Sequence, residues 1–233
     1  MSEKKKIKVF LIGDHPMAPS GVGTQLRYIC EALLKTGRYQ FICFGGAIKH
    51  ESYEPTQLNG DDWDKEDWMV YPVDGYGNAE MVRSLLRTQK PDMLLFMTDP
   101  RFYGWLWQIE NEIRPLIPMV YYHVWDNYPY PKFNKVWYDS TDVVASISKL
   151  TYDIVNNVSP DTENHYIPHA VQKQVFKPLS EENVKNFREE YFNKDEGDED
   201  KLIFFWNNRN ARRKQSGSLI FWFNEFAEEV GPE

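Results

Sequence analysis

The sequence predicts an α/β fold: an open, doubly wound parallel sheet with helices on both faces. Short apolar runs alternate with amphipathic stretches along roughly the first 170 residues. The runs are continuously apolar, which is typical of strands buried on both faces of a parallel sheet. Alternation of strand and helix at this spacing favours right-handed βαβ units.

The first elements follow from apolar pattern and stop signals. Ile7–Ile12 is a compact run rich in β-branched residues, which predicts a buried strand. Apolar residues recur at helical spacing within Thr24–Lys35, and Gly37 supplies the stop of that helix. Tyr39–Phe44 and Trp68–Val73 are the next expected strands. The polar stretch between them, residues 50–67, is expected to be an ordered surface excursion.

The rest of this domain continues the same rhythm. Asn78 is expected to cap a helix over Ala79–Gln89, which ends before Pro91. Met93–Met97 is a fully apolar strand, and Phe102–Ile113 is expected to form one helix. The remaining expected elements are the strands Ile117–Val124 and Asp142–Ile147 and the helix Lys149–Asn157.

A domain boundary is expected near residue 178. The stretch Ile167–Pro178 holds two prolines and no clear period, and Ser180 then looks like the cap of a helix running to Phe192. We therefore expect a first Rossmann-like domain over residues 1–178, and a linker helix with the start of a second domain over 179–233.

The second domain is expected to be incomplete. After an acidic loop at Asn193–Lys201, the pattern restarts with an expected strand at Leu202–Trp206 and a helix at Ser218–Val230. A single βα unit cannot cover its own apolar face. We therefore expect this polypeptide to need further chain for the activity discussed below.

Composition excludes several classes of protein. The chain has 27 basic and 35 acidic residues, a formal net charge of −8, which disfavours sequence-independent nucleic-acid binding. Apolar residues make up 42% and aromatic residues 15%, too many for a disordered chain. Cys30 and Cys43 are expected to be free buried thiols, with a single bridge as the alternative. With no transmembrane or signal-peptide pattern in the sequence, we expect a cytoplasmic protein.

A glycine-containing loop joins the first expected strand to the first helix. Gly21, Val22 and Gly23 bring backbone close to a helix N-terminus, where N–H groups and the helix dipole favour a phosphate. The alternative is a plain glycine turn. Leu26 occupies the place of the third glycine of a dinucleotide-binding fingerprint, and there is no Walker A lysine.

A basic cluster follows the expected strand at Leu202–Trp206. Four of the six residues from Arg209 to Lys214 are basic, in an otherwise acidic chain. Arg209 and Lys214 are five residues apart across the expected strand-to-helix loop, so both could reach one anionic group such as a diphosphate. The alternative is a solvated charge run that balances the acidic loop upstream.

The third candidate site follows a central strand. His123 and Asp126 lie where a substrate hydroxyl could be bound or deprotonated. The alternative, a hydrogen-bonded structural histidine, applies equally to His15 and His169. No Cys and His cluster has zinc-site spacing, and two Asp-x-Asp pairs in polar loops, Asp62 with Asp64 and Asp198 with Asp200, are interpreted as solvated surface. We expect no metal and no cofactor.

Three stretches together resemble the GT-B glycosyltransferases, specifically family 4. They are the glycine loop SGVGTQLRYICEALLKTG, the interdomain stretch YIPHAVQKQVFKP and the segment WNNRNARRKQSGSLIFWFNEFA. Ala170 and Gln172 stand where that family usually has Gly and Asp, and Asn208 stands where it has Gly.

The resemblance implies a nucleotide sugar as donor substrate and transfer to a hydroxyl acceptor, with retention of configuration. It implies that Gly21, Val22, Gly23, Arg209 and Lys214 approach the donor diphosphate, and that His123 and Asp126 lie on the acceptor side. The acceptor hydroxyl belongs to a glycan, a lipid or a protein, and peripheral membrane contact stays open, as does the oligomeric state.

Two other functions are considered. One is a non-catalytic binding or interaction domain of the same fold. The other, a nicotinamide oxidoreductase, is disfavoured by Leu26 and by Gly45-Gly46, which end the second strand where a ribose-binding acid would be needed.

Overall fold

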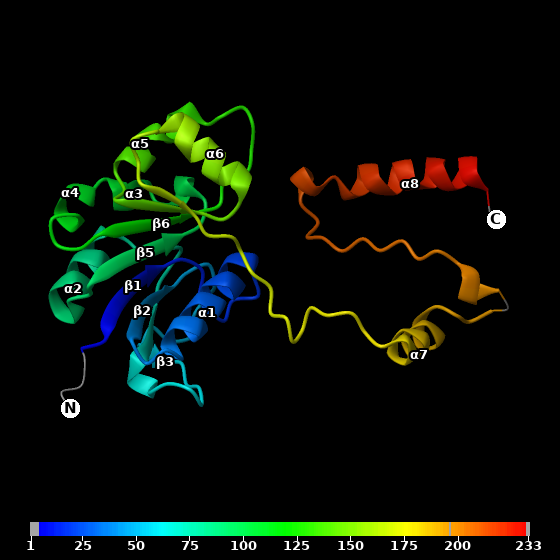
Figure 1. Cartoon of the computed structure of the whole chain (residues 1–233), viewed down its shortest axis with the longest axis horizontal. Coiled ribbons are helices and arrows are strands. Elements are labelled where there is room, and N and C mark those ends of the chain that lie inside the picture. The colour runs from blue at the N-terminus through cyan, green and yellow to red at the C-terminus, as the bar shows by residue number, and fades with distance from the viewer. Residues whose placement is uncertain (1–4, 196, 232–233) are drawn as a thin grey trace. The chain divides into compact units, whose positions relative to one another are not determined.

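The computed structural model describes residues 5–195 and 197–231, and the chain divides into the units Met1–Val171 and Gln172–Glu233. The first unit is a Rossmann-like α/β domain, which confirms the predicted fold class (Figure 1). Its single sheet has the strand order β3-β4-β2-β1-β5-β6-β7-β8. Every neighbouring pair is parallel except β3 with β4.

Six of the eight strands lie close to the expected positions, whereas β3 and β8 were not expected. The bounds of the strands are β1 Ile7–Ile12, β2 Tyr39–Gly45, β3 Thr56–Gln57, β4 Trp68–Pro72, β5 Met93–Met97, β6 Met119–His123, β7 Val143–Ser146 and β8 Asn164–Tyr166. The helices are α1 Gly21–Leu34, α2 Ala79–Gln89, α3 Gly104–Trp107, α4 Glu110–Ile113, α5 Lys135–Asp139, α6 Lys149–Val158, α7 Glu181–Tyr191 and α8 Ser216–Val230. Four of the helices follow a capping residue. Its side chain accepts a hydrogen bond from the backbone N–H of the residue three positions later. These caps are Ser20, Asn78, Ser148 and Ser180.

The sheet divides the apolar core into two layers. Val9 and Leu11 of β1 pack with α1 on one face, whereas Phe10 and Ile12 point to the other face. That second face is covered by helices α2 to α6. Because the strands of a doubly covered sheet bury both of their faces, they must be apolar at nearly every position, as the sequence is.

The order in which successive strands are added to the sheet reverses at β1. Val9 of β1 is in register with Phe41 of β2 on one side and with Met93 of β5 on the other. From β1 the chain moves outward through β2 and β4, and then returns to build β5, β6, β7 and β8 on the opposite side. In open α/β sheets ligands bind outside the carboxyl ends of the strands at such a switch point.

The single helix expected over Phe102–Ile113 is wrong. The segment forms a 3₁₀ turn at Pro100–Phe102 and then two short helices, α3 and α4, separated by non-helical backbone at Ile109. The buried hydroxyl of Tyr103 donates to the carbonyls of Ile12 and Met97, which ties the start of the segment to two strands. This anchoring fixes the first turn, and the break at Ile109 lets both helices bury apolar residues.

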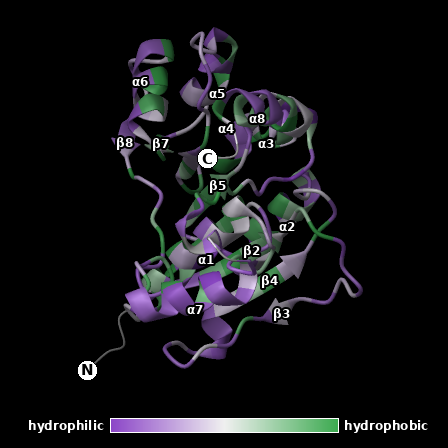
Figure 2. Cartoon of the chain, turned by 90° about the vertical axis from the view of Figure 1, so that its right-hand side faces the viewer, coloured by the Kyte–Doolittle hydropathy of each residue, from purple (hydrophilic) through white to green (hydrophobic). Residues whose placement is uncertain are grey.

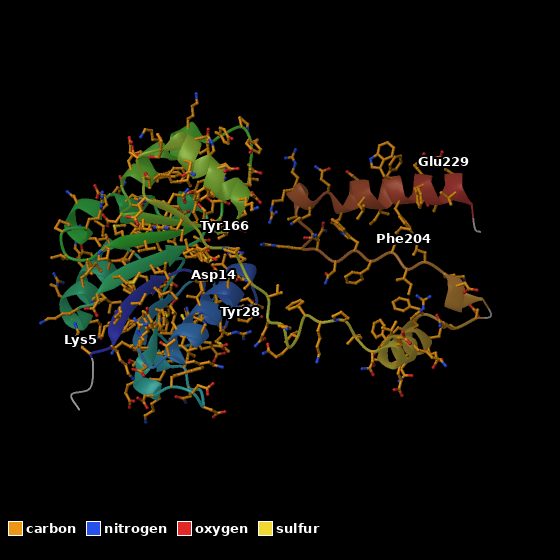
Figure 3. All side chains as sticks on the ribbon, in the orientation of Figure 1. Lys5, Asp14, Tyr28, Tyr166, Phe204 and Glu229 are labelled. Carbon is orange, nitrogen blue, oxygen red and sulfur yellow. The ribbon has the colours of Figure 1, made fainter. Side chains whose placement is uncertain are left out.

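The strand expected at Leu202–Trp206 is also wrong. No secondary structure is assigned to these residues, and the side chains of Leu202 and Phe205 are 80% and 83% exposed. A strand needs a neighbour to satisfy its N–H and C=O groups, and the described part of the second unit offers none. Helix α7 is predominantly hydrophilic (Figure 2), whereas α8 carries aromatic residues that pack with Phe204, labelled in Figure 3. Among residues 5–195 and 197–231, no helix is both long and apolar enough to cross a bilayer.

Candidate functional site

The loops that follow β1 and β5 carry polar side chains at the switch point. Asp14 and Ser20 belong to the first loop, and Thr98 and Asp99 to the second. Tyr76 approaches from the segment between β4 and α2. The carboxyl ends of β1 and β5 thus form an edge where hydroxyls and carboxylates converge, and we call it the switch-point edge.

Asp14 is a buried carboxylate held by hydroxyl groups. It is 6% exposed, and its oxygens accept hydrogen bonds from the hydroxyls of Ser20 at 2.5 Å and Tyr76 at 3.0 Å (Asp14 is labelled in Figure 3). Within residues 5–195 and 197–231 it has no ion-pair partner. A buried charge without a cation is costly, so it needs these hydrogen bonds. Sequence reasoning missed Asp14, although its place directly after a buried strand was a usable signal.

The glycine loop is at the N-terminus of α1. Gly23 has a structural reason to be glycine, because a Cβ there would lie 2.7 Å from the carbonyl oxygen of His15 and 2.9 Å from that of Ala18. Gly21 is exposed, and a Cβ on it would meet nothing within 4 Å. Ser20 already accepts hydrogen bonds from the N–H groups of Gly23 and Thr24. The N–H groups of Gly21 and Val22 are therefore those a ligand could use.

Two histidines lie close together here: His15 belongs to the loop before α1, and His50 belongs to the segment after β2. Nδ1 of His15 accepts from the N–H of Met17 at 3.0 Å, and Nε2 of His50 donates to the carbonyl of Gly45 at 2.6 Å. Their ring centroids are 6.1 Å apart. Burial, and secondly the nearby His50, lower the pKa of His15 from its ordinary value. His15 is therefore a neutral donor or acceptor at pH 7.

His123 is fully buried at the end of β6, which corrects the expectation that it meets an acceptor hydroxyl directly. Its Nε2 lies 2.7 Å from the hydroxyl of Tyr138. Burial lowers the pKa of His123 to about 3, and the carboxylate of Asp99 opposes that shift. A general base must be within hydrogen-bond reach of the proton it removes. In this structure His123 has the structural role that was its alternative interpretation.

Asp126, by contrast, is accessible. It lies on the exposed loop after β6 and has no hydrogen-bond or ion-pair partner in the described parts of the chain. The preceding residue is fixed, because the hydroxyl of Thr151 on α6 donates to the carbonyl of Trp125 at 2.8 Å. Asp126 is therefore a free carboxylate on an anchored loop.

Asp99 and Arg101 form a pair that the sequence analysis did not single out. Nε and Nη2 of Arg101 donate to the two carboxylate oxygens of Asp99 at 2.8 and 2.5 Å. Burial raises the pKa of Asp99, but its hydrogen bonds with Arg101 outweigh that effect and hold the pKa below its usual range. The guanidinium carbon also lies 5.8 Å from the ring centroid of Trp125. The signal was present, since both residues lie within four positions of the end of the buried strand β5.

Arg209 and Lys214 belong to the second unit. Arg209 is exposed and Lys214 half-buried, and neither side chain has a hydrogen bond or ion pair in the described residues. Lys214 ends a 3₁₀ turn at Arg212–Lys214 rather than a strand-to-helix loop, because the preceding strand does not form. His169 is exposed, and its ring lies 5.4 Å from that of Tyr122.

The Asp-x-Asp interpretation needs a correction at Asp198. It is 7% exposed rather than solvated, and its carboxylate accepts from the N–H groups of Lys194 and Asp195, each at 2.8 Å. The Lys201 ammonium and these N–H groups lower the pKa of Asp198 to about 2. Asp198 therefore organises the acidic loop.

Metal ligands and similarity to known proteins are two further kinds of evidence on the switch-point edge. In the described residues no group of three or more His, Cys, Asp or Glu side chains is placed to hold a metal ion. No protein-family model matches the chain, and no curated protein matches it in sequence.

Proposed function

We propose that the chain is part of a glycosyltransferase that moves a sugar from a nucleotide-sugar donor to a hydroxyl acceptor, with retention and without a metal. The observation that carries the proposal is the glycine loop at the topological switch point. There Gly21 is exposed at the start of α1, and its surroundings do not require a glycine. The resemblance to GT-B glycosyltransferases of family 4 supports the same assignment.

On the donor side, the first unit supplies backbone N–H groups for the diphosphate. The N–H groups of Gly21 and Val22 lie at the positive end of the α1 dipole, which favours an anion. In the second unit, taken by itself, Arg209 and Lys214 have no anionic partner in the described residues, and the resemblance assigns their charges to the departing diphosphate.

On the acceptor side, Asp126 is the residue we assign to the acceptor hydroxyl. A carboxylate without a partner can accept the hydroxyl proton in a hydrogen bond and orient the attacking oxygen. His123 contributes indirectly, through its contact with Tyr138 in the core beside β6, the strand that precedes Asp126. The proposal places the reaction in the cytoplasm, where two free thiols such as Cys30 and Cys43 persist.

Calorimetry with UDP-glucose and GDP-mannose tests the proposal. We expect binding of one donor, weakened at least about tenfold by Arg209→Ala, because a lost charge-assisted contact costs about 1.5–3 kcal/mol. Arg213→Ala is the matched control, since it removes an equal charge from the same segment. Binding of neither donor, or equal losses in both variants, would contradict the assignment.

The burial of His123 favours a second candidate, a non-catalytic binding domain of the same fold. The two functions differ in one measurement. Part of a transferase binds a nucleotide-sugar donor, and Arg209→Ala weakens that binding, whereas a binding domain that has lost its donor half binds neither donor.

A further inference from the structure

Exposed aromatic rings gather next to the switch-point edge. Phe102 and Phe133 are 54% and 63% exposed, and Trp125 is half-buried. The ring centroids of Trp125 and Phe133 are 5.7 Å apart, and the guanidinium of Arg101 lies over the Trp125 ring. We call Arg101, Phe102, Trp125 and Phe133 the aromatic surface.

The aromatic surface is held by the domain core. The indole of Trp125 packs against the core layer of α2 to α6, and its carbonyl is held by Thr151. Phe133 is next to Asn134, a buried residue whose amide donates to Tyr138 at 3.1 Å. On the other side, Phe102 contacts Tyr76 at a centroid distance of 5.3 Å. The segments that carry these rings are therefore anchored to the domain, which lowers the entropic cost of binding a ligand.

The polar groups beside these rings indicate what kind of ligand fits. The charges beside these rings balance, because Arg101 pairs with Asp99 and the exposed carboxylate of Asp126 is matched by the exposed ammonium of Lys132, so no excess of cations favours an anionic ligand. A purely apolar ligand would desolvate these charged groups without compensation. The indole N–H of Trp125 is a further donor, buried and without a partner in the described residues.

We propose that the aromatic surface binds a neutral saccharide. A sugar ring has an apolar C–H face that suits the faces of Phe102, Trp125 and Phe133, and hydroxyls that suit the carboxylate of Asp126 and the Asp99–Arg101 pair. The inference rests on the proposed function, and it names the acceptor class: the hydroxyl acceptor is a glycan without negative charge.

The whole chain, labelled with a fluorophore, is applied to a printed array of neutral, sialylated, uronic-acid and sulfated oligosaccharides. We expect the neutral set to retain the protein. The best neutral oligosaccharide is then titrated by calorimetry against three variants. Phe102→Ala and Phe133→Ala should each bind about tenfold more weakly. Leu116→Ala, which truncates a side chain 68% exposed before β6, should bind like the wild type.

Each result decides the matter. Preference for charged glycans, absence of neutral binders, or full affinity in both phenylalanine variants would overturn the inference. The phenylalanine side chains are mostly solvent-exposed, so thermal melting of the variants should stay close to wild type. Donor titration separates the two proposals: donor binding without saccharide binding overturns only this inference. Saccharide binding without donor binding overturns the transferase and leaves a lectin-like domain.

Discussion

The hydroxyl of Tyr138 lies 2.7 Å from Nε2 of His123 and receives a hydrogen bond from the amide of Asn134 at 3.1 Å. Because Asn134 can only donate through its nitrogen, the Tyr138 proton is directed to Nε2. The neutral imidazole then carries its proton on Nδ1. These three buried side chains form one network on α5, its preceding turn and β6.

Tyr138→Phe should destabilise the domain by about 1–3 kcal/mol, because it leaves the Asn134 amide and His123 Nε2 buried without a partner. Urea unfolding followed by tryptophan fluorescence measures the loss. Tyr166→Phe removes the same atom from a residue that is 45% exposed, and should change stability by less than about 0.5 kcal/mol. Equal effects of the two variants would contradict the network.

The depressed pKa of His123 predicts acid sensitivity. Its folded-state pKa of about 3 lies below the ordinary value of 6.5, so only the unfolded state takes up this proton between those limits. Stability therefore falls as pH drops from 6.5 toward 3, by up to about 1.4 kcal/mol per pH unit from this group. Urea unfolding at pH 6.5 and pH 5 should show a smaller loss for His123→Gln. His15 and His169 are present in both proteins. The difference between their two losses of stability therefore reports on His123.

The two glycines of the loop before α1 should separate structure from binding. Gly23→Ala forces a Cβ against two backbone oxygens and should cost about 1–3 kcal/mol. Gly21→Ala enters open space and should leave stability within about 0.5 kcal/mol. If Gly21 approaches the diphosphate, Gly21→Ala should still weaken donor binding. If Gly21→Ala were as unstable as Gly23→Ala, the open space around Gly21 would be contradicted.

The two thiols should resist modification in the folded state. Cys30 and Cys43 are both 0% exposed, and burial, with Cys43 as its neighbour, raises the pKa of Cys30 well above its usual value. Both should react with Ellman's reagent only after unfolding in guanidinium. Ser52→Cys places a thiol at an exposed position and should react at once. Rapid reaction of the native wild type would mean that this core opens readily.

Most helices and strands of the first unit could be predicted from the sequence, because the signals for them are local. Asn78 caps α2 over the expected residues, and β1 and β5 have the predicted bounds. In contrast, the turn that starts the segment Phe102–Ile113 is held by Tyr103, whose hydroxyl partners belong to two strands. No pattern within Phe102–Ile113 contains that information.

The candidate site shows the same division. Placement at strand ends is visible in sequence, and it put His123 at the end of β6 and Asp126 after it. Burial of a side chain depends on what packs over it, here Tyr138 from α5, so the sequence could not separate a buried His123 from an exposed Asp126. The strand predicted at Leu202–Trp206 was wrong for a related reason, because strand formation depends on a partner elsewhere in the chain.

The polar excursion between β2 and β4 gives the sheet its outermost strand, β3, only two residues long and antiparallel to β4. At the opposite border β8 has three residues. Long exposed borders let sheets from different molecules join and aggregate, and short ones offer few free N–H and C=O groups for such pairing. The domain is thereby protected against edge-to-edge aggregation, and we expect its copies to associate, where they do, through side chains rather than through a shared sheet.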